Sequence, residues 1–143
     1  MKPIVRNIIA VAAGIIGGGA INMCIVMISG KIIPPPPGAD LTTMEGLKAS
    51  MHLMEPKHFI LPFLAHALGT FAGSILTAKI AYSRTMQLAM IVGMVNLIGG
   101  ISNIFMLPGP VWFNVIDVTL AYLPMAYIGA MIIMTSNKRG NPA

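Results

Sequence analysis

The sequence predicts an all-α integral membrane protein: a bundle of four transmembrane helices in up-down-up-down order, with a short interfacial helix between the first and second. Three observations predict this fold class. Only 9% of the 143 residues are charged and 56% are apolar, whereas soluble domains carry about 25% charged residues. Four apolar segments are each long enough to cross a bilayer as a helix. Most basic residues stand near the ends of those segments, where they can reach the lipid head groups.

Length and composition also exclude several classes of protein. A chain of 143 residues leaves room for one membrane domain, residues 1–143, and for no separate soluble domain. The formal charge of +5 comes from residues at helix ends rather than from a basic stripe, so no nucleic-acid partner is expected. Cys24 is the single cysteine, which excludes an intrachain disulfide and a CxxC redox or haem motif. We expect no cofactor.

The first transmembrane helix is predicted at about residues 4–27. The run from Asn7 to Gly30 contains no charged residue, and this is too long for the core of a cleaved signal peptide. Gly14 and Gly18 within it permit another helix to come close. Four consecutive prolines follow at 34–37 and predict a stiff, extended spacer.

A short amphipathic helix is predicted at about residues 43–54, inside the loop 31–57 that joins the first two transmembrane helices. Thr42 and Glu45 fit a capping box, with Thr42 as the N-cap and Glu45 reaching back to it. Apolar residues follow at helical spacing, which is typical of a helix that lies in the membrane interface. Pro56 is well placed to begin the next helix, because proline is tolerated in a first turn.

The second transmembrane helix is predicted at about residues 59–82. No Asp, Glu, Lys or Arg occurs between Phe59 and Ala78. Small side chains recur at every fourth position and therefore share one face of the helix; they are Ala65, Gly69, Gly73 and Thr77. A face of this kind predicts close packing against another helix.

The third and fourth transmembrane helices are predicted at about residues 85–107 and 111–134. A tight turn near Ser83 precedes the third helix. The sequence Leu-Pro-Gly-Pro at 107–110 separates the two helices, because proline and glycine interrupt helices. Pro124 should kink the fourth helix, since proline cannot donate the backbone hydrogen bond of an ordinary helical residue.

The basic residues predict the orientation of the chain in the membrane. Six of them fall on one side of the predicted bundle, namely Lys2, Arg6, Lys79, Arg84, Lys138 and Arg139. In the loop 31–57 three lysines are balanced by Asp40, Glu45 and Glu55. Because cytoplasmic segments carry the excess of Lys and Arg, both termini are expected in the cytoplasm and the loop outside.

Each predicted transmembrane helix carries a polar side chain in the outer half of the membrane; the full set is Asn22, His66, Asn96, Asn103 and Asp117, with Asn96 deeper. A carboxylate in hydrocarbon is costly, so Asp117 should face the bundle, a water-filled cavity or a partner. His66 is its best partner in the chain. One interpretation is a pocket in which Asp117 is a proton or cation site and His66 its relay. The other is a layer that holds the helices in register through hydrogen bonds worth about 0.6 kcal/mol each.

A second candidate set lies in the loop, where His52, Glu55 and His58 form the pattern HxxExxH. Imidazole and carboxylate groups suit zinc. However, Pro56 interrupts the helix, and residues six apart do not share one helix face. The favoured interpretation is therefore a group of interfacial polar residues, and the metal site is the alternative.

Three stretches together carry a resemblance to known proteins: IIPPPPGAD at 32–40, MEPKHFILPFLAHALGTFAG at 54–73 and MLPGPVWFNVIDVTLAYLPMAYIG at 106–129. With them the chain resembles a group of small, uncharacterised four-helix membrane proteins of bacteria. The resemblance covers nearly the whole chain and implies a bacterial inner-membrane protein with four helices. It implies no activity, ligand or site.

Three classes of function fit these observations. The favoured class is a structural or accessory protein of the lipid bilayer, which forms a homo-oligomer or joins a larger membrane complex through faces such as Ala65-Gly69-Gly73-Thr77. The second is a small transporter or channel coupled to protons or cations through Asp117. The third is a lipid- or quinone-binding protein, or an enzyme that uses His66 and Asp117 as an acid–base pair. The sequence has no recognisable nucleophile, so an enzyme is the less favoured interpretation.

Overall fold

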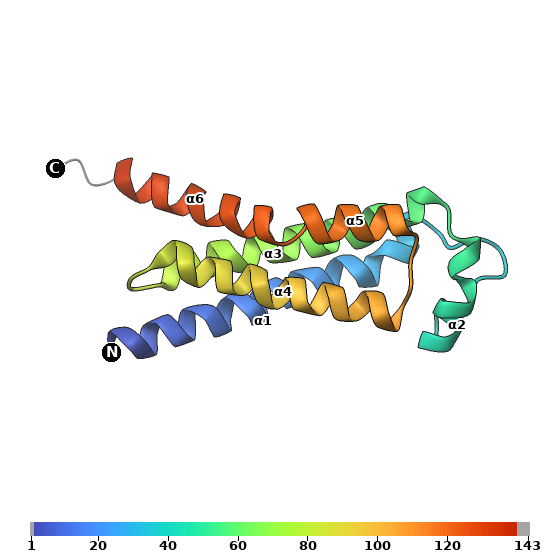
Figure 1. Cartoon of the computed structure of the whole chain (residues 1–143), viewed down its shortest axis with the longest axis horizontal. Helices are drawn as coiled ribbons and strands as arrows, with labels where there is room; N and C mark the ends of the chain where they lie inside the picture. Colours follow the sequence, from blue (N-terminus) through green and yellow to red (C-terminus); the bar gives the residue numbers. More distant parts are fainter. Residues whose placement is uncertain (1, 140–143) are drawn as a thin grey trace.

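Four long apolar helices pack as a bundle with a short helix between the first two, which confirms the predicted fold class (Figure 1). The computed structural model describes residues 2–139, and the side chains of residues 2–137. The long helices are α1 (Pro3–Ile32), α3 (Ile60–Ile80), α4 (Thr85–Met106) and a fourth that is divided into α5 (Val111–Leu120) and α6 (Leu123–Arg139). The start of α1, the α3–α4 turn and the end of α6 lie at one end, here called the terminal end. The opposite end, where α2 (Met44–Ser50) lies, is called the α2 end.

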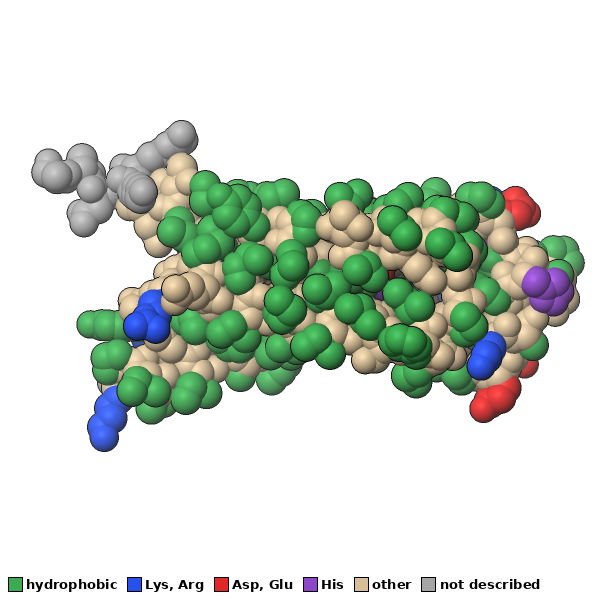
Figure 2. All heavy atoms as spheres, viewed as in Figure 1, with side chains coloured by type: hydrophobic (Ala, Val, Ile, Leu, Met, Phe, Trp, Pro, Cys, Tyr) green, Lys and Arg blue, Asp and Glu red, His purple; other side chains and the backbone are tan. Residues whose placement is uncertain are grey.

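The surface of the bundle is suited to lipid. Four helical segments are long and apolar enough to cross a membrane: Pro3–Ile32, Pro56–Ile80, Thr85–Met106 and Val111–Asn137. Large apolar side chains point outward along them, and Ile16, Phe105 and Val111 are 72%, 82% and 78% exposed. Figure 2 shows hydrophobic side chains along the length of this face and charged side chains at its two ends. The chain is therefore a small multi-pass membrane protein in contact with the bilayer.

Helices α1 and α3 form the most extensive helix pair in the bundle. Glycines on both sides allow their backbones to touch. A Cβ atom added at Gly73 would lie 2.5 Å from the carbonyl oxygen of Gly14, and one added at Gly18 would lie 2.5 Å from the carbonyl oxygen of Gly69. The small-residue face that the sequence predicted is buried here; its members are Ala65, Gly69, Gly73 and Thr77. Because α1 of the same chain covers this face, it offers no surface for the self-association that the sequence suggested.

Hydrogen bonds fasten α1 to the α3–α4 turn at the terminal end. Arg6 Nε donates to the carbonyl oxygen of Ile80 at 2.6 Å. The side-chain oxygen of Asn7 accepts hydrogen bonds from the backbone amides of Tyr82 and Ser83 at 2.9 and 3.3 Å. These contacts satisfy backbone groups that the end of a helix leaves without partners. The predicted tight turn near Ser83 is thus held by α1.

The N-cap of α2 differs from the predicted one. Thr43 is the N-cap, and its side-chain oxygen accepts the backbone N–H of Gly46 at 2.9 Å. Thr42 instead donates its amide and hydroxyl hydrogens to Asp40 Oδ1, at 2.8 and 2.6 Å. Asp40 thereby holds Thr42 in a turn, so the helix begins one residue later than the capping box with Glu45 required. From Met51 to Leu53 the helix continues as a 3₁₀ turn, η1.

Two predicted helix bounds also change. Helix α1 continues to Ile32, beyond the predicted end at residue 27, because nothing in the sequence interrupts it before the prolines. The residue that precedes a proline is driven out of the helical conformation, and Ile33 accordingly has φ −121° and ψ 95°. The second span begins with a 3₁₀ turn, η2 (Pro56–Phe59), that leads into α3. Pro56 begins this turn, as the sequence predicted.

Candidate intramembrane polar site

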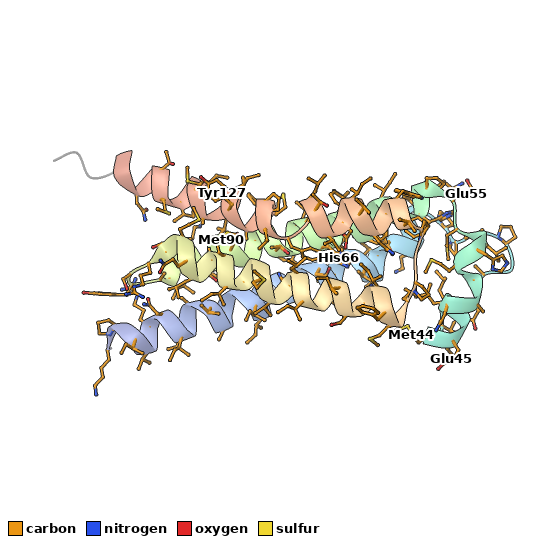
Figure 3. All side chains as sticks on the ribbon, viewed as in Figure 1. Met44, Glu45, Glu55, His66, Met90 and Tyr127 are labelled. Carbon is orange, nitrogen blue, oxygen red and sulfur yellow. The ribbon has the colours of Figure 1, made fainter. Side chains whose placement is uncertain are left out.

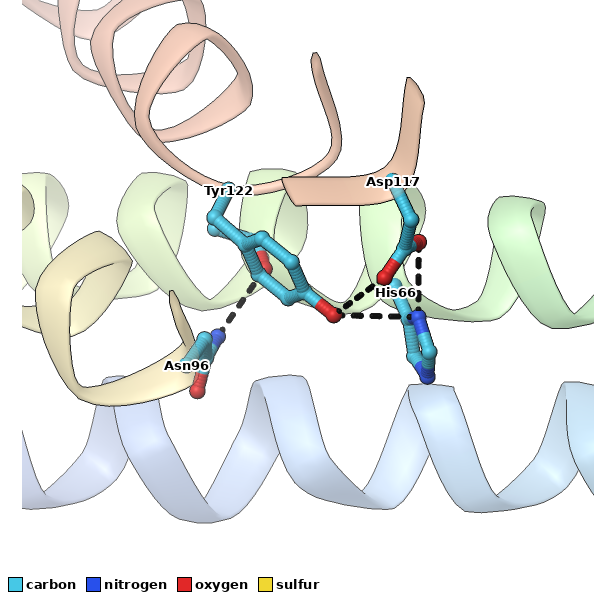
Figure 4. A network of polar contacts seen from close by, with 5 residues as sticks. His66, Asn96, Asp117 and Tyr122 are labelled. Atoms are coloured by element: carbon cyan, nitrogen blue, oxygen red, sulfur yellow. Dashed lines mark hydrogen bonds and ion pairs between the residues drawn. The ribbon is translucent and has the colours of Figure 1, made fainter. Parts of the chain in front are cut away.

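His66, Asp117 and Tyr122 form one hydrogen-bonded group inside the bundle (Figure 4). His66 Nδ1 lies 2.8 Å from Asp117 Oδ1. The hydroxyl of Tyr122 donates to Asp117 Oδ2 at 2.8 Å, and its oxygen lies 3.1 Å from His66 Nδ1. The side chain of Asp117 is 4% exposed and that of His66 is 20% exposed. The structure thus brings the predicted pair together, and it adds a tyrosine that the sequence reasoning missed.

A break in the fourth span positions Asp117 and Tyr122. Helix α5 ends at Leu120 and α6 begins at Leu123, so Ala121 and Tyr122 form a turn between them. The predicted kink is therefore a full interruption, one turn before Pro124. Proline lacks the amide that would continue the hydrogen-bond ladder, and this frees the chain to turn the Tyr122 ring inward. The proximity of Tyr122 to Pro124 was the signal that could have identified it.

The three side chains are anchored in the core of the bundle. Tyr122 is 2% exposed and packs with Ala67 and Ala121, which are also buried. Its ring stacks on the imidazole of His66 with ring centroids 5.7 Å apart. Stacking and hydrogen bonding together fix the orientation of the imidazole. The second ring nitrogen of His66, Nε2, makes no hydrogen bond to the part of the chain that the structure describes, and in Figure 4 it points away from Asp117.

The three asparagines of the predicted layer do not bond to this group directly. Asn96 Nδ2 donates to Thr70 Oγ1 at 3.0 Å. Asn22 Oδ1 is buried and has no hydrogen-bond partner. The side chain of Asn103 has no hydrogen bond to another described residue, and its backbone carbonyl accepts the amide of Leu107. Asn103 is exposed, so the unused buried capacity of the three asparagines among the described residues is the acceptor oxygen of Asn22.

A large cavity connects these polar residues in the half of the bundle nearer α2. Its volume is about 1030 Å³, at the upper end of the range of about 300–1,000 Å³ for small-molecule pockets. The polar residues in its wall are Asn22, Ser29, His58, His66, Thr70, Asn96, Asn103, Asn114, Asp117 and Tyr122. Most of the remaining wall is apolar, with Val26 and Met27 from α1 and Ile104 and Leu107 from α4. Figure 3 shows His66 among the helices in this half of the molecule.

The segment around α2 forms part of the wall of this cavity. Leu41, Met44, Leu47, Met51 and Met54 all line it. Figure 1 shows α2 lying across the end of the bundle, away from the long helices. Within the segment the amide of Asp40 donates to Ser50 Oγ at 2.9 Å, and His58 Nε2, at the start of the second span, bonds the carbonyl oxygen of Pro34 at 3.1 Å. The predicted amphipathic helix thus turns its apolar face to the cavity.

Glycines at two positions leave space in the cavity wall. Gly19 and Gly99 both line the cavity, and a Cβ atom added at either meets no atom within 4 Å. Their neighbours Gly18 and Gly100 differ, since a Cβ atom there would collide with the Gly69 carbonyl and with the Tyr122 ring respectively. Both positions are exposed, so larger side chains at 19 and 99 fit at this edge of the cavity without forcing the helices apart.

The second candidate set, His52, Glu55 and His58, does not converge. His52 Nδ1 bonds the carbonyl oxygen of Ala49 at 2.8 Å. The amide of Glu55 donates to His58 Nδ1 at 3.0 Å, so both ring nitrogens of His58 are occupied by the backbone. The Glu55 carboxylate pairs with Lys57 at 3.0 Å. Within residues 2–137, no group of three or more His, Cys, Asp or Glu side chains is arranged to hold a metal ion.

A scan against protein-family models, a search of the curated proteins and a search of the solved structures each found no match to this chain. The architecture defines its class, a small multi-pass membrane protein with four candidate spans.

Proposed function

We propose that this protein binds an amphipathic small molecule drawn from the bilayer. The apolar part of the ligand occupies the cavity beneath α2, and its polar head group bonds His66 Nε2. The observation that carries the proposal is the orientation of His66: its Nδ1 is held by the buried Asp117 carboxyl group while Nε2 has no partner. A hydrogen bond that holds one ring nitrogen of a histidine commonly orients the other nitrogen toward a ligand.

The shape of the cavity favours binding over passage through the membrane. Its wall begins at Gly18 on α1, Thr70 on α3 and Val95 on α4, and extends from there toward α2. Nearer the terminal end the same helices are tightly packed, and Val92 and Thr77 are both 0% exposed. A cavity closed on that side supports a binding site for a bilayer component better than a transport pathway. The accessory role has less support, because the contact face suggested for it is buried against α1 within the same chain.

We further propose the bacterial inner membrane as the location, with both termini in the cytoplasm. Lys2, Arg6 and Arg84 are grouped near the terminal end, and cytoplasmic segments carry the excess of Lys and Arg. A reporter fused after residue 139 that is active only in the cytoplasm should be active, and one inserted at Gly38, in the loop, should not. The opposite pair of results would show that the chain has the reverse orientation, and the binding proposal would be unaffected.

Photolabelling in phosphatidylcholine vesicles tests the binding proposal. The probes share a 16-carbon chain with a diazirine at its far end and differ only in the head: a methyl ketone, a plain hydrocarbon in which CH₂ replaces the C=O, and a sulfate ester. The expected result is that at least one probe labels cavity residues such as Met51 and Leu107 more strongly than the outward-facing Ile132. If no probe labels the cavity above Ile132, the proposal fails.

Cavity-filling variants provide the control for this experiment. The double variant Gly19→Leu, Gly99→Leu places two leucines at positions that line the cavity and where an added Cβ atom meets no neighbour. It should abolish labelling of Met51 and Leu107 while leaving labelling of Ile132 unchanged. Ala20→Leu places a leucine at the neighbouring position of α1, which is not among the residues that line the cavity, and it should change labelling at neither place. Equal cavity labelling in all three proteins would show that the probes react from the lipid side.

A further inference from the structure

We infer that Arg6 binds the phosphate of an anionic phospholipid at the terminal end of the bundle, with the acyl chains of that lipid against the outer surface of α1. The inference does not rest on the proposed function, because the cavity lies toward the α2 end. Three observations carry it: the fixed position of the guanidinium group, the charge of the residues around it and its level in the membrane.

The Arg6 side chain is held in one place on the surface of the bundle. Its Nε donates to the carbonyl oxygen of Ile80 at 2.6 Å, and its guanidinium carbon lies 5.9 Å from the centre of the Tyr82 ring. Neither Nη atom bonds another residue in the part of the chain that the structure describes. The N–H groups of both Nη atoms are therefore available, in the planar fork that binds phosphate oxygens in pairs.

No acidic side chain is placed to neutralise Arg6. The chain has four acidic residues, which are Asp40, Glu45, Glu55 and Asp117. The first three belong to the loop at the α2 end, and Asp117 is hydrogen-bonded to His66 and Tyr122 inside the bundle. Lys2 is the N-cap of α1, and its carbonyl oxygen accepts the amide of Arg6 at 3.1 Å, so a second positive charge is near. The face in Figure 2 shows basic side chains and no acidic ones at this end. The counter-charge for Arg6 therefore comes from the surroundings of the bundle.

The level of Arg6 in the membrane favours a lipid over a free anion. Arg6 is in the first turn of α1 and Ile80 is the last residue of α3, so both lie where the apolar spans end and head groups begin. Tyr82 is 60% exposed beside them, and tyrosine is typical of this level. One turn further into the membrane, Ile9 is 45% exposed on the same side of α1 as Arg6. A phospholipid can contact both Arg6 and Ile9, whereas a free phosphate contacts Arg6 alone.

Lipid photolabelling in phosphatidylcholine vesicles tests the inference in the wild-type protein. Two probes, a phosphatidylglycerol and a phosphatidylcholine, carry identical acyl chains with a diazirine near the head group. The phosphatidylglycerol should label Ile9 about fivefold more than the phosphatidylcholine, because one basic residue at a membrane surface attracts anionic lipid by about that factor. The two probes should label Val111, which is 78% exposed near the α2 end, equally. Equal labelling by both probes at Ile9, or the same preference at Val111 as at Ile9, would overturn the inference.

Inorganic phosphate separates a lipid from a free anion as the ligand. Sodium phosphate is added to the vesicles and compared with sodium chloride at the same ionic strength, because any salt weakens electrostatic attraction. The phosphatidylglycerol preference at Ile9 should be the same in both salts. Its loss in phosphate alone would show that the site takes a free phosphate ion, and the lipid would be the wrong ligand.

Substitutions that keep the charge test the guanidinium fork itself. Arg6→Lys retains a positive charge but replaces the planar fork with a single ammonium group, and it should reduce the preference at Ile9. Arg84→Lys makes the same change at an exposed position of the α3–α4 turn and should leave the preference unchanged. An equal effect of both substitutions, or of neither, would assign the preference to the summed charge of the terminal end and would overturn the role of Arg6.

Removal of the charge gives the largest expected effect. In Arg6→Gln the ratio of phosphatidylglycerol to phosphatidylcholine labelling at Ile9 should fall from about five to about one. In Arg84→Gln, the matched control, it should stay near five. A ratio near five in Arg6→Gln would show that another group attracts the lipid. The wild-type comparisons and the charge-preserving pair decide the inference if Arg6→Gln does not fold.

Discussion

The contact between α1 and α3 allows one substitution to be predicted in detail. In Gly73→Ala the added Cβ atom would lie 2.5 Å from the carbonyl oxygen of Gly14 and 3.3 Å from the Cα atom of Gly18. Ordinary van der Waals contact begins at 3.4 Å. The helices must therefore separate by roughly 0.9 Å at this point, because both groups are backbone atoms that cannot rotate away.

The energetic cost follows from this displacement. Overpacking of a close interface costs about 1–3 kcal/mol. The hydrogen bond from Thr77 Oγ1 to the carbonyl oxygen of Ala10, which is 3.1 Å long and joins the same two helices, would lengthen and forfeit a further contribution of about 0.6 kcal/mol. Alanine is also a better helix former than glycine by about 0.8–1.0 kcal/mol. The expected net loss is about 0.6–2.8 kcal/mol.

Gly19→Ala is the matched control, because its Cβ atom meets nothing within 4 Å and it receives the same gain in helix propensity. Reversible unfolding by SDS in mixed micelles, followed by circular dichroism, measures both variants against the wild type. Gly73→Ala should unfold at a lower SDS mole fraction than the wild type, and Gly19→Ala at an equal or higher one. If the two variants unfold together, the backbone contact between α1 and α3 is not as close as the structure has it.

Three further predictions follow from single contacts. Tyr122→Phe removes the donor to Asp117 Oδ2 and should lower stability in the same SDS assay by about 0.6 kcal/mol, the average for side-chain hydrogen bonds in a membrane bundle, and by no more than about 1.7 kcal/mol, the largest value; no loss would show that the hydroxyl is dispensable to the group. Thr43→Ala removes the N-cap of α2 and should cost that helix about 1 kcal/mol, seen as faster hydrogen exchange in residues 44–50, whereas Thr42→Ala should leave the cap intact. Hydrogen bonds from the Thr42 hydroxyl and then its amide lower the pKa of Asp40 from its ordinary value of 3.8. The turn at 40–42 is therefore fully stabilised above pH 3.8 and loosens as the pH falls below it; exchange of the Thr42 amide, corrected for intrinsic pH dependence, should accelerate there in the wild type and not in Asp40→Asn.

The sequence was sufficient to predict the four spans and their order. The chain has too few polar residues to shield runs of about 20 apolar residues from water, so these runs lie in lipid. A helix satisfies its own backbone hydrogen-bonding groups there. The pairing of His66 with Asp117 was also predictable in outline, because a carboxyl group at that depth requires a partner. Tyr122 was missed: its proximity to Pro124 marks it in the sequence, but that proximity does not give the direction of the ring until the helix break is known. The N-cap of α2 was predicted one residue too early, because Thr42 donates its hydrogens to Asp40 and Thr43 caps the helix instead.

Hydrophobicity and the positions of helix breakers thus determined, without any coordinates, that this chain is a small all-α membrane protein with a polar layer. Only the tertiary structure decided what surrounds that layer. The glycines of α1 and α3 bring those two helices into backbone contact, while the long helices and the α2 segment together leave a cavity of about 1030 Å³ toward the α2 end. A cavity is a property of the distances between helices, and these depend on the packing of side chains from distant parts of the chain, which no local pattern specifies.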